Sequence, residues 1–263
     1  KAGDTIVKID KTDTDGLFVE EAIQLIRGAP GTDVMLTIVR DGWESVKEFS
    51  VTREIIEVPT LDYAMGDDAI MHIQLYGFNE NAPYRFAEAA RAALDQQARG
   101  VVLDLRNDPG GYLEVAVNIA NWFLKDDQII VSEKFRDGGQ KGFRARGDGP
   151  LAGMPVVVLV NNGSASASEI LAGALRDQRK AKLVGEKTYG KGSVQELESL
   201  SDGSTLKFTV ARWVLPSGVI IEGNGLEPDI AVKITEKDIK DKKDPQLSRA
   251  IETLKSELAL TGR

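Results

Sequence analysis

Hydrophobic and polar positions divide this chain into a short first region and a longer second one. The elements expected in the first region are a strand at 4–10, a helix at 18–28, and strands at 32–40 and 46–54. The apolar residues of the expected helix recur at helical spacing, and the last two strands are joined by a turn at Asp41-Gly42. The pattern therefore predicts a small unit over residues 1–57.

Strands and helices alternate along the second region. The expected elements, in chain order, are a strand at 69–78, a helix at 82–97, a strand at 100–105, a helix at 110–125, a strand at 154–162 and a helix at 168–180. Several of these strands are apolar throughout, which is typical of strands buried on both faces of a parallel sheet. We therefore expect an α/β core with a largely parallel sheet over residues 58–235.

The pattern changes after Gly192. Residues 205–215 alternate, a turn follows at 216–218, and residues 219–221 are apolar, which predicts a hairpin appended to the core. Residues 236–263 are rich in Lys and Asp and finish in a helical pattern at 244–258. We expect them to form a charged C-terminal helical tail with a solvated face.

Composition excludes several classes of function. Apolar residues make up 42% and charged residues 28%, which is ordinary for a globular protein, and the net charge is −8. Because no basic stripe with interleaved aromatic residues is present, nucleic acid is not an expected partner. The chain has no cysteine, which excludes disulfides, thiolate zinc sites and a cysteine nucleophile. No cofactor and no metal site is expected.

The segment "NNGSASASEI" (161–170) contains the candidate nucleophile. It follows an apolar strand and precedes a helix, and the N-terminus of a helix stabilises developing negative charge. An equally good alternative is that Ser166 caps the helix, because Ser166 and Glu169 have the spacing of a capping box. The pattern by itself leaves both open.

A serine nucleophile needs a base, and histidine is a poor candidate in this chain. The only histidine, His72, lies within an expected strand, where a structural role is favoured. A neutral lysine can replace histidine, but free lysine has a pKa near ~10.4, so such a base needs a buried site away from carboxylates. Lys191 lies between two glycines in "GEKTYGKGSVQ", and Gln195 could orient its amine. The alternative is a surface lysine in a glycine turn.

Two further patterns bear on this site. Residues 185–191 match the first seven positions of a phosphate-binding loop, but Gly192 stands where Ser or Thr should hold magnesium and no helix follows, so no nucleotide is expected. In "LDLRNDPGGYLEV" (103–115), Gly110 and Gly111 leave backbone N–H groups beside a helix start. Together with the N–H of Ala167 they could bind an oxyanion. The alternative is an ordinary strand-to-helix turn.

Together, these segments resemble the carboxyl-terminal processing peptidases, a family of serine endopeptidases with a Ser–Lys dyad. "NNGSASASEILAGALRD" is similar to the nucleophile segment of that family, "GEKTYGKGSVQ" to its lysine segment, and "LDLRNDPGG" to its oxyanion loop. The resemblance implies Ser166 as nucleophile, Lys191 as general base and Gln195 as the residue that positions the lysine. It implies backbone donors to the oxyanion from these residues: Ala167, Gly110 and Gly111.

The resemblance also implies a fold and a setting. The core would be crotonase-like (ClpP/crotonase-type), preceded by a partial PDZ domain over residues 1–57 whose first part, with its carboxylate-binding loop, is missing. The implied substrates are polypeptides cut near apolar C-termini, with a homo-oligomer or an adaptor protein as further partners. The implied location is exported: periplasm, cell envelope or thylakoid lumen, although no signal sequence is present here. A non-catalytic, PDZ-containing peptide-binding or scaffold protein is the alternative.

Overall fold

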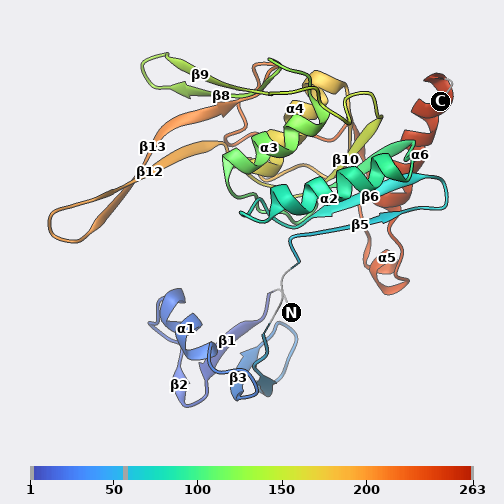
Figure 1. Ribbon diagram of the computed structural model, residues 1–263. Coiled ribbons are helices and arrows are strands. Elements are labelled where there is room, and N and C mark those ends of the chain that lie inside the picture. The colour runs from blue at the N-terminus through green and yellow to red at the C-terminus, as the bar shows by residue number, and fades with distance from the viewer. Residues whose placement is uncertain (1–2, 56–58, 262–263) are drawn as a thin grey trace. The chain divides into compact units, whose positions relative to one another are not determined.

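The computed structural model describes residues 3–55 and 59–261. It divides into two compact units, over residues 1–58 and 59–263. The predicted end of the first region lies among the residues outside the described ranges. Figure 1 labels helices and strands of both units.

Unit 1 is a four-stranded antiparallel sheet with one helix. Its elements are β1 (Thr5–Ile9), β2 (Thr12–Asp13), α1 (Val19–Ile26), β3 (Asp33–Val39) and β4 (Lys47–Thr52). The strand order is β2-β1-β3-β4. Ile9 and Val34 are its buried apolar side chains, each 1% exposed, and no residue of α1 is buried. The predicted strands and helix of this region are confirmed, but the described part of the unit has a small core.

Unit 2 is organised around a six-stranded sheet. Its strands are β5 (Leu61–Met65), β6 (Ile70–Leu75), β7 (Gly100–Asp104), β10 (Val156–Val160), β11 (Lys182–Gly185) and β14 (Ile230–Ala231). The order is β14-β11-β10-β7-β6-β5, and all neighbours run parallel except the β5–β6 pair. The predicted α/β core with a largely parallel sheet is confirmed.

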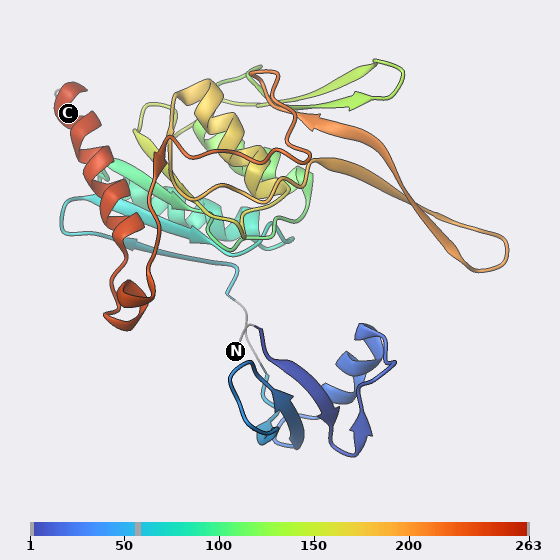
Figure 2. The ribbon, with the colours of Figure 1, turned by 180° about the vertical axis from the view of Figure 1, so that it is seen from behind.

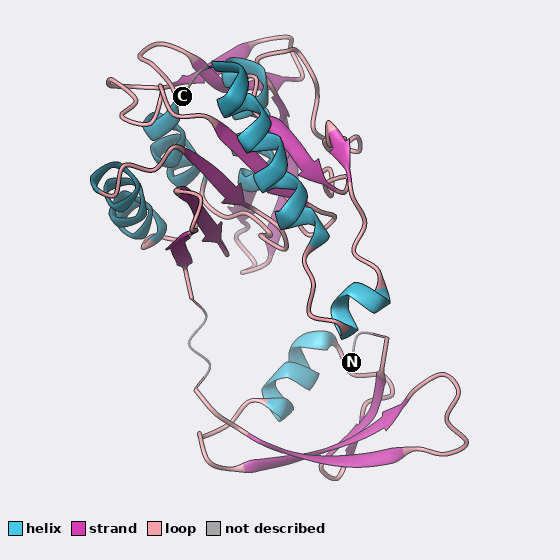
Figure 3. Ribbon diagram, turned by 90° about the vertical axis from the view of Figure 1, so that its right-hand side faces the viewer, coloured by secondary structure: helices cyan, strands magenta, loops and turns pink. Residues whose placement is uncertain are grey.

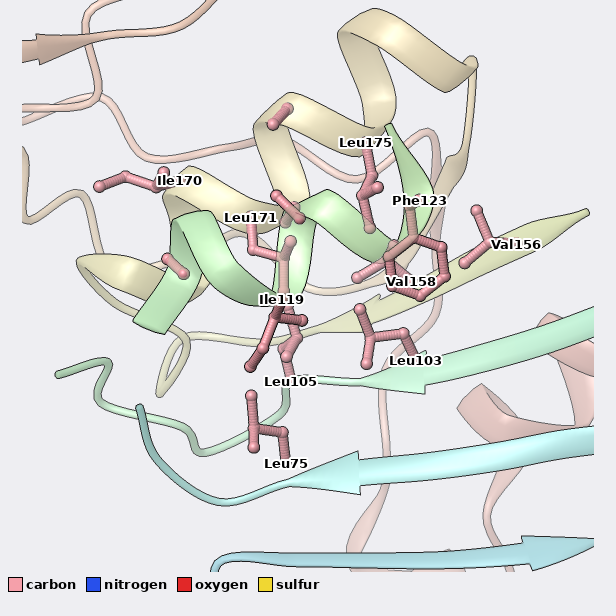
Figure 4. Packing of buried hydrophobic residues seen from close by; sticks show 14 of the residues in the cluster. Leu75, Leu103, Leu105, Ile119, Phe123, Val156, Val158, Ile170, Leu171 and Leu175 are labelled. Atoms are coloured by element: carbon pink, nitrogen blue, oxygen red, sulfur yellow. The ribbon is translucent and has the colours of Figure 1, made fainter. Parts of the chain in front are cut away.

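Helices cover both faces of this sheet, as Figures 1 and 3 show. These are α2 (Ala82–Asp95), α3 (Leu113–Phe123) and α4 (Ala167–Arg179) on one face, and α6 (Pro245–Thr261) on the other, with the short α5 (Glu236–Lys240) before it. Successive side chains of a strand point to opposite faces. Val158 packs with Phe123 and Leu171 of α3 and α4 (Figure 4), whereas Leu159 packs with Leu254 of α6. This double burial explains the continuous apolar runs.

The C-terminal segment is therefore part of the core unit. The helix over residues 244–258 was predicted, but its charged residues cover only one face. The opposite face is apolar and buried. Ala250, Leu254 and Leu258 are at most 1% exposed and complete the hydrophobic cluster on the second face of the sheet.

A second, four-stranded sheet of unit 2 lies beside the core in the order β12-β13-β8-β9. Its strands are β8 (Ile129–Phe135), β9 (Gln140–Arg144), β12 (Ser193–Ser199) and β13 (Thr205–Val214). The predicted turn after β13 exists: Val214 forms a bridge with Ile220, and the N–H of Leu215 donates to the carbonyl oxygen of Val219 at 2.9 Å. The long ladder of β13 is instead with β12, and this hairpin extends away from the helices (Figure 2). Its outer half is exposed on both faces, so its sequence has little apolar signal.

Two loops of unit 2 meet at one edge of the parallel sheet. The loop after β7 and the loop after β10 follow neighbouring parallel strands, so they begin at the same edge. The N–H of Ala165 donates to the carbonyl oxygen of Asp108 at 3.0 Å, and the N–H of Asn107 donates to the side chain of Asn161 at 2.8 Å. These bonds join the predicted oxyanion loop to the predicted nucleophile segment.

Candidate active site

The three serines of the segment after β10 differ in what their hydroxyls do. The Ser164 hydroxyl donates to the carbonyl oxygen of Leu105 at 2.7 Å, and the Ser168 hydroxyl donates to that of Asp108 at 2.9 Å. Both serines are fully buried. The Ser166 hydroxyl is partly exposed and has no hydrogen-bond partner within the described ranges. Ser166 is therefore the serine whose oxygen is available to attack a bound molecule.

Ser166 also has an unusual backbone conformation. Its φ is +58° and its ψ is −114°, a combination that costs free energy for a residue with a Cβ and that often occurs at functional sites. The N–H of Ile170 donates to the Ser166 carbonyl oxygen at 3.0 Å, and α4 begins at Ala167. The strained turn presents the hydroxyl at the positive end of the helix.

The capping box expected at this position is present. The Glu169 carboxylate accepts from the Ser166 N–H at 2.9 Å, and the Ser166 side chain faces the Glu169 N–H without forming a capping hydrogen bond to the helix. The position of Ser166 therefore fits both a helix cap and a nucleophile.

Glu169 connects the nucleophile segment to the lysine segment. Its Oε2 atom accepts both the Ser166 N–H and the Lys191 N–H, each at 2.9 Å. Its Oε1 atom accepts the Thr188 hydroxyl at 2.5 Å and the Gly190 N–H at 2.7 Å. Glu169 is fully buried, so these four donors satisfy a charge that would otherwise be costly in the interior. The backbones of Ser166 and Lys191 thus meet at one oxygen atom.

Sequence reasoning assigned Glu169 only a capping partner and missed this connection. No local pattern could have shown it, because Lys191 lies 22 positions further along the chain. The available signal was a charged residue in the first turn of a helix whose neighbouring residues there carry no charge. The same bonds also argue against a phosphate-binding loop, since Gly190 and Lys191 donate their N–H groups to the carboxylate and β12 follows instead of a helix.

The Lys191 side chain itself is exposed, and this differs from the sequence expectation of a buried amine. Gln195 lies on β12 and is also exposed, and within the described ranges no hydrogen bond joins it to Lys191. The physical reason is that Lys191 directly precedes the hairpin that extends away from the core. Its backbone is fixed by Glu169 on one side, and the N–H of Gly192 donates to Glu222 at 2.7 Å on the other.

Gly110 of the predicted oxyanion loop packs directly against the nucleophile segment. A Cβ added to Gly110 would stand 2.5 Å from the carbonyl oxygen of Ala165, and 2.9 Å from both the Ala167 nitrogen and the Ser166 Cβ. Its φ of +93° also favours glycine. Only a residue without a side chain allows the two segments to approach this closely.

The three predicted backbone donors differ in their availability. The Gly110 N–H donates to Oδ1 of Asp108 at 2.8 Å, so it is occupied. Gly111 lies opposite Phe78 in a bridge whose hydrogen bonds are made by the Gly110 carbonyl oxygen and the Tyr112 N–H. The N–H of Gly111 itself has no partner in the part of the chain that the structure describes. The Ala167 N–H, at the start of α4, has none there either. Ala167 and Gly111 are thus the free donors.

Asp108 is fully buried next to these donors. Burial raises its pKa to about 7, although the Gly110 N–H and the Ser168 hydroxyl act in the opposite direction. Its Oδ2 atom has no hydrogen-bond partner among the described residues. This carboxyl group was not singled out from the sequence, because an Asp before Pro-Gly-Gly is a common turn pattern.

Arg106 ties the base of the same loop to the C-terminal segment. Its guanidinium donates to Asp104 at 2.6 Å and to Asp244 at 2.8 Å. Asp104 is fully buried and also lies 3.2 Å from Nε2 of His72. The structural role expected for His72 agrees with this contact, since its imidazole interacts with Asp104.

Comparison with known proteins adds a family to this geometry. The profile of the family described as peptidase family S41 matches residues 69–232, which is more than half of the chain. The chain belongs to peptidase family S41. Ser166, Glu169 and Lys191 all lie inside the matched range.

Relatives in the S41 family bear related names. A carboxyl-terminal-processing protease from Synechocystis is 39% identical over 99% of this chain, and the CtpA carboxy-terminal processing protease of Bacillus subtilis is 36% identical over 89%. This chain spans 62% and 50% of the lengths of those two relatives. A solved structure titled photosystem II D1 C-terminal processing protease matches 88% of this chain and 63% of its own, with a TM-score of 0.72 and 32% identity.

The described residues offer neither a metal-binding cluster nor a membrane-spanning helix. Among residues 3–55 and 59–261, no three His, Asp or Glu side chains cluster in a way that could hold a metal ion. Over the same ranges, no helix is long and apolar enough to cross a membrane.

Proposed function

We propose that this chain is a serine endopeptidase in which Ser166 is the nucleophile and neutral Lys191 is the general base. The observation that supports this most is the shared Glu169 oxygen, which brings the backbones of both residues together beside an unpaired serine hydroxyl. The strained conformation of Ser166 at the start of α4 supports it independently. Membership in the S41 peptidase family agrees with hydrolysis of polypeptides.

The proposed reaction has two steps. Ser166 Oγ attacks the scissile carbonyl carbon while Nζ of Lys191 takes the hydroxyl proton, and the resulting ammonium then protonates the leaving amine. Water next attacks the acyl ester and gives a proton to Nζ of Lys191. The ammonium returns that proton to Ser166 Oγ as the ester bond breaks, which releases the N-terminal fragment as a carboxylic acid and restores both residues. Both steps pass through a tetrahedral intermediate with a negatively charged oxygen.

The oxyanion would be bound by the free N–H groups of Ala167 and Gly111. The occupied N–H of Gly110 is the weaker candidate, because it donates to Asp108. Gly110 instead allows the loop to approach Ser166 closely. The N-terminus of α4 adds a favourable partial positive charge at the same position.

Lys191 must be neutral to accept a proton, and its side chain is exposed in this structure. We propose that a bound polypeptide covers the amine and removes water from it. Gln195, on the strand that follows, would then orient the amine by a hydrogen bond without adding a charge. Lys191 is therefore a base only in the complex with substrate.

Finer features follow from the resemblance of the sequence. Unit 1 would be the C-terminal part of a PDZ domain, and its antiparallel sheet with one helix is compatible with that. The core would be crotonase-like, and the substrates would be unfolded chains or C-terminal tails cut near apolar C-termini. We propose an exported protein, in the periplasm, cell envelope or a lumen, with a homo-oligomer or an adaptor as further partners. Subcellular fractionation of the full-length protein tests the location.

Cleavage of an unfolded protein with an apolar C-terminus tests the proposed activity. Mass spectrometry of the products should show new C-termini near the original end, made by the parent and not by Ser166→Ala. Lys187→Ala is a matched control on the same loop, because Lys187 forms an exposed ion pair with Glu227 and has no proposed role. Peptide binding without turnover, unchanged in Ser166→Ala, would instead favour the non-catalytic peptide-binding alternative.

A further inference from the structure

A buried carboxyl group with one unsatisfied oxygen lies at the edge of the proposed oxyanion site. Asp108 is 0% exposed, and its Oδ1 accepts the Gly110 N–H at 2.8 Å. Its Oδ2 is buried and has no hydrogen-bond partner among the described residues. Buried polar atoms in folded proteins are nearly always paired, so an unpaired one needs an explanation.

The position of Asp108 couples it to the nucleophile segment. Its backbone carbonyl oxygen accepts the Ala165 N–H and the Ser168 hydroxyl, on either side of Ser166. The peptide that its side chain holds, Gly110, is the one that packs against Ser166. The Asp108 carboxyl is therefore joined by one hydrogen bond to the glycine that packs against Ser166 and Ala167.

Among the described residues, no ion pair joins Asp108 to a cationic side chain, and no charged group is among the influences on its carboxyl. Arg106 lies on the same loop, and Glu169 lies on α4, which the loop contacts through Ser168. Arg106 is paired with Asp104 and Asp244, and Glu169 is an acid that accepts four donors of its own. The influences on the Asp108 carboxyl are burial, one N–H group and one hydroxyl, with no charged neighbour among them. Because burial raises its pKa to about 7, both of its forms are populated near neutrality.

We propose that Asp108 is a positioning residue of the oxyanion loop, and that the protonated form of its carboxyl is the form competent for catalysis. In either form Oδ1 can accept the Gly110 N–H and fix the glycine turn. In the ionised form an uncompensated negative charge in a low-dielectric site opposes the developing oxyanion. This inference rests on the proposed peptidase function. It makes Asp108 and Lys191 opposed in pH dependence, since one must keep a proton and the other must lose one.

The ratio of cleavage rates of two enzymes isolates this effect. Asp108→Asn keeps the oxygen that accepts the Gly110 N–H and removes the charge, while the contribution of Lys191 cancels in the ratio of Asn variant to parent. We expect a ratio near one at pH 5.5 that rises to about tenfold or more by pH 9. Asp108→Ala, which leaves the Gly110 N–H unpaired, should be slower than Asp108→Asn at every pH. Asp95→Asn, at an exposed position at the end of α2, is the matched control with a flat ratio.

A ratio that stays constant with pH, or that falls as pH rises, would overturn the proposal. A second measurement does not depend on turnover: the infrared carbonyl band of a protonated buried carboxyl should disappear as the pH is raised through neutrality and be absent in Asp108→Asn. Absence of that band from the parent at pH 5.5 would overturn the proposal as well. Failure of the peptidase function itself would be seen separately, as absence of turnover by the parent, and the infrared band would then still test the protonation of Asp108.

Discussion

The replacement of Glu169 by glutamine tests the connection between the nucleophile and lysine segments. Glutamine has the same shape, but one carboxylate oxygen becomes an NH₂ group that cannot accept a hydrogen bond. If that group faces the Oε2 site, the N–H groups of Ser166 and Lys191 both lose their acceptor. If it faces the Oε1 site, Gly190 and the Thr188 hydroxyl lose theirs, and only the hydroxyl can turn to another partner.

The size of the effect follows from these bonds. Each buried donor left unpaired costs about 1–3 kcal/mol. One or two such donors predict that Glu169→Gln lowers the free energy of unfolding by about 2–4 kcal/mol. Cleavage activity should fall by about 100-fold or more, because loss of the shared acceptor lets Ser166 and Lys191 move relative to each other.

Urea unfolding and initial cleavage rates of the same preparations measure both effects. Glu114→Gln is the matched control, since Glu114 also lies in the first turn of a helix, α3, and is exposed. Its unfolding free energy should change by no more than about 0.5 kcal/mol. A Glu169→Gln variant that matches this control in stability and keeps the parent's activity would refute the reasoning.

Three further predictions concern the same part of the molecule. Gly110→Ala should lose most activity, because the new Cβ would stand 2.5 Å from a carbonyl oxygen of the nucleophile segment. Gly138 has a similar φ of +88° and no atom within 4 Å of an added Cβ. Gly138→Ala is therefore the control, and thermal unfolding should show its stability reduced only by the ~1–2 kcal/mol of backbone strain. Arg106→Met should lower the unfolding free energy by about 3–5 kcal/mol, since it leaves the buried Asp104 carboxylate without its cation; an unchanged urea midpoint would contradict this. The folded state holds the Asp108 proton between the ordinary pKa of 3.8 and about 7, so the parent should lose up to about 4 kcal/mol of stability as pH rises through that window, whereas Asp108→Asn should not. Urea midpoints of both proteins at pH 4.5 and pH 7.5 measure that difference.

Much of the core could be predicted from the sequence because burial on both faces leaves long apolar runs. The strand at 154–162 and the helix after it were identified in this way, and the segment "NNGSASASEI" between them drew attention to Ser166. The short strands β5, β11 and β14 were not predicted. They are too short, or too mixed in polarity, to stand out from the loops around them.

The contacts that define the site could not be predicted, because they join residues far apart in the chain. The fold, and no local pattern, brings Glu169 to Lys191 and the carbonyl oxygen of Asp108 to Ser168. The ladder between β12 and β13 was missed for a different reason. The alternation over residues 205–215 marks β13, but the apolar residues at 219–221 were predicted as its partner instead of β12, most of which is exposed. The exposure of Lys191 depends on that same hairpin.

The rate of cleavage of an unfolded polypeptide, measured against pH for the parent, Ser166→Ala and Lys191→Ala, tests the central claim most directly. The Ser–Lys mechanism predicts that the parent cleaves the polypeptide and that both variants lack turnover at every pH while remaining folded. Turnover at the parent's rate by either variant would contradict the assignment of these two residues as nucleophile and base.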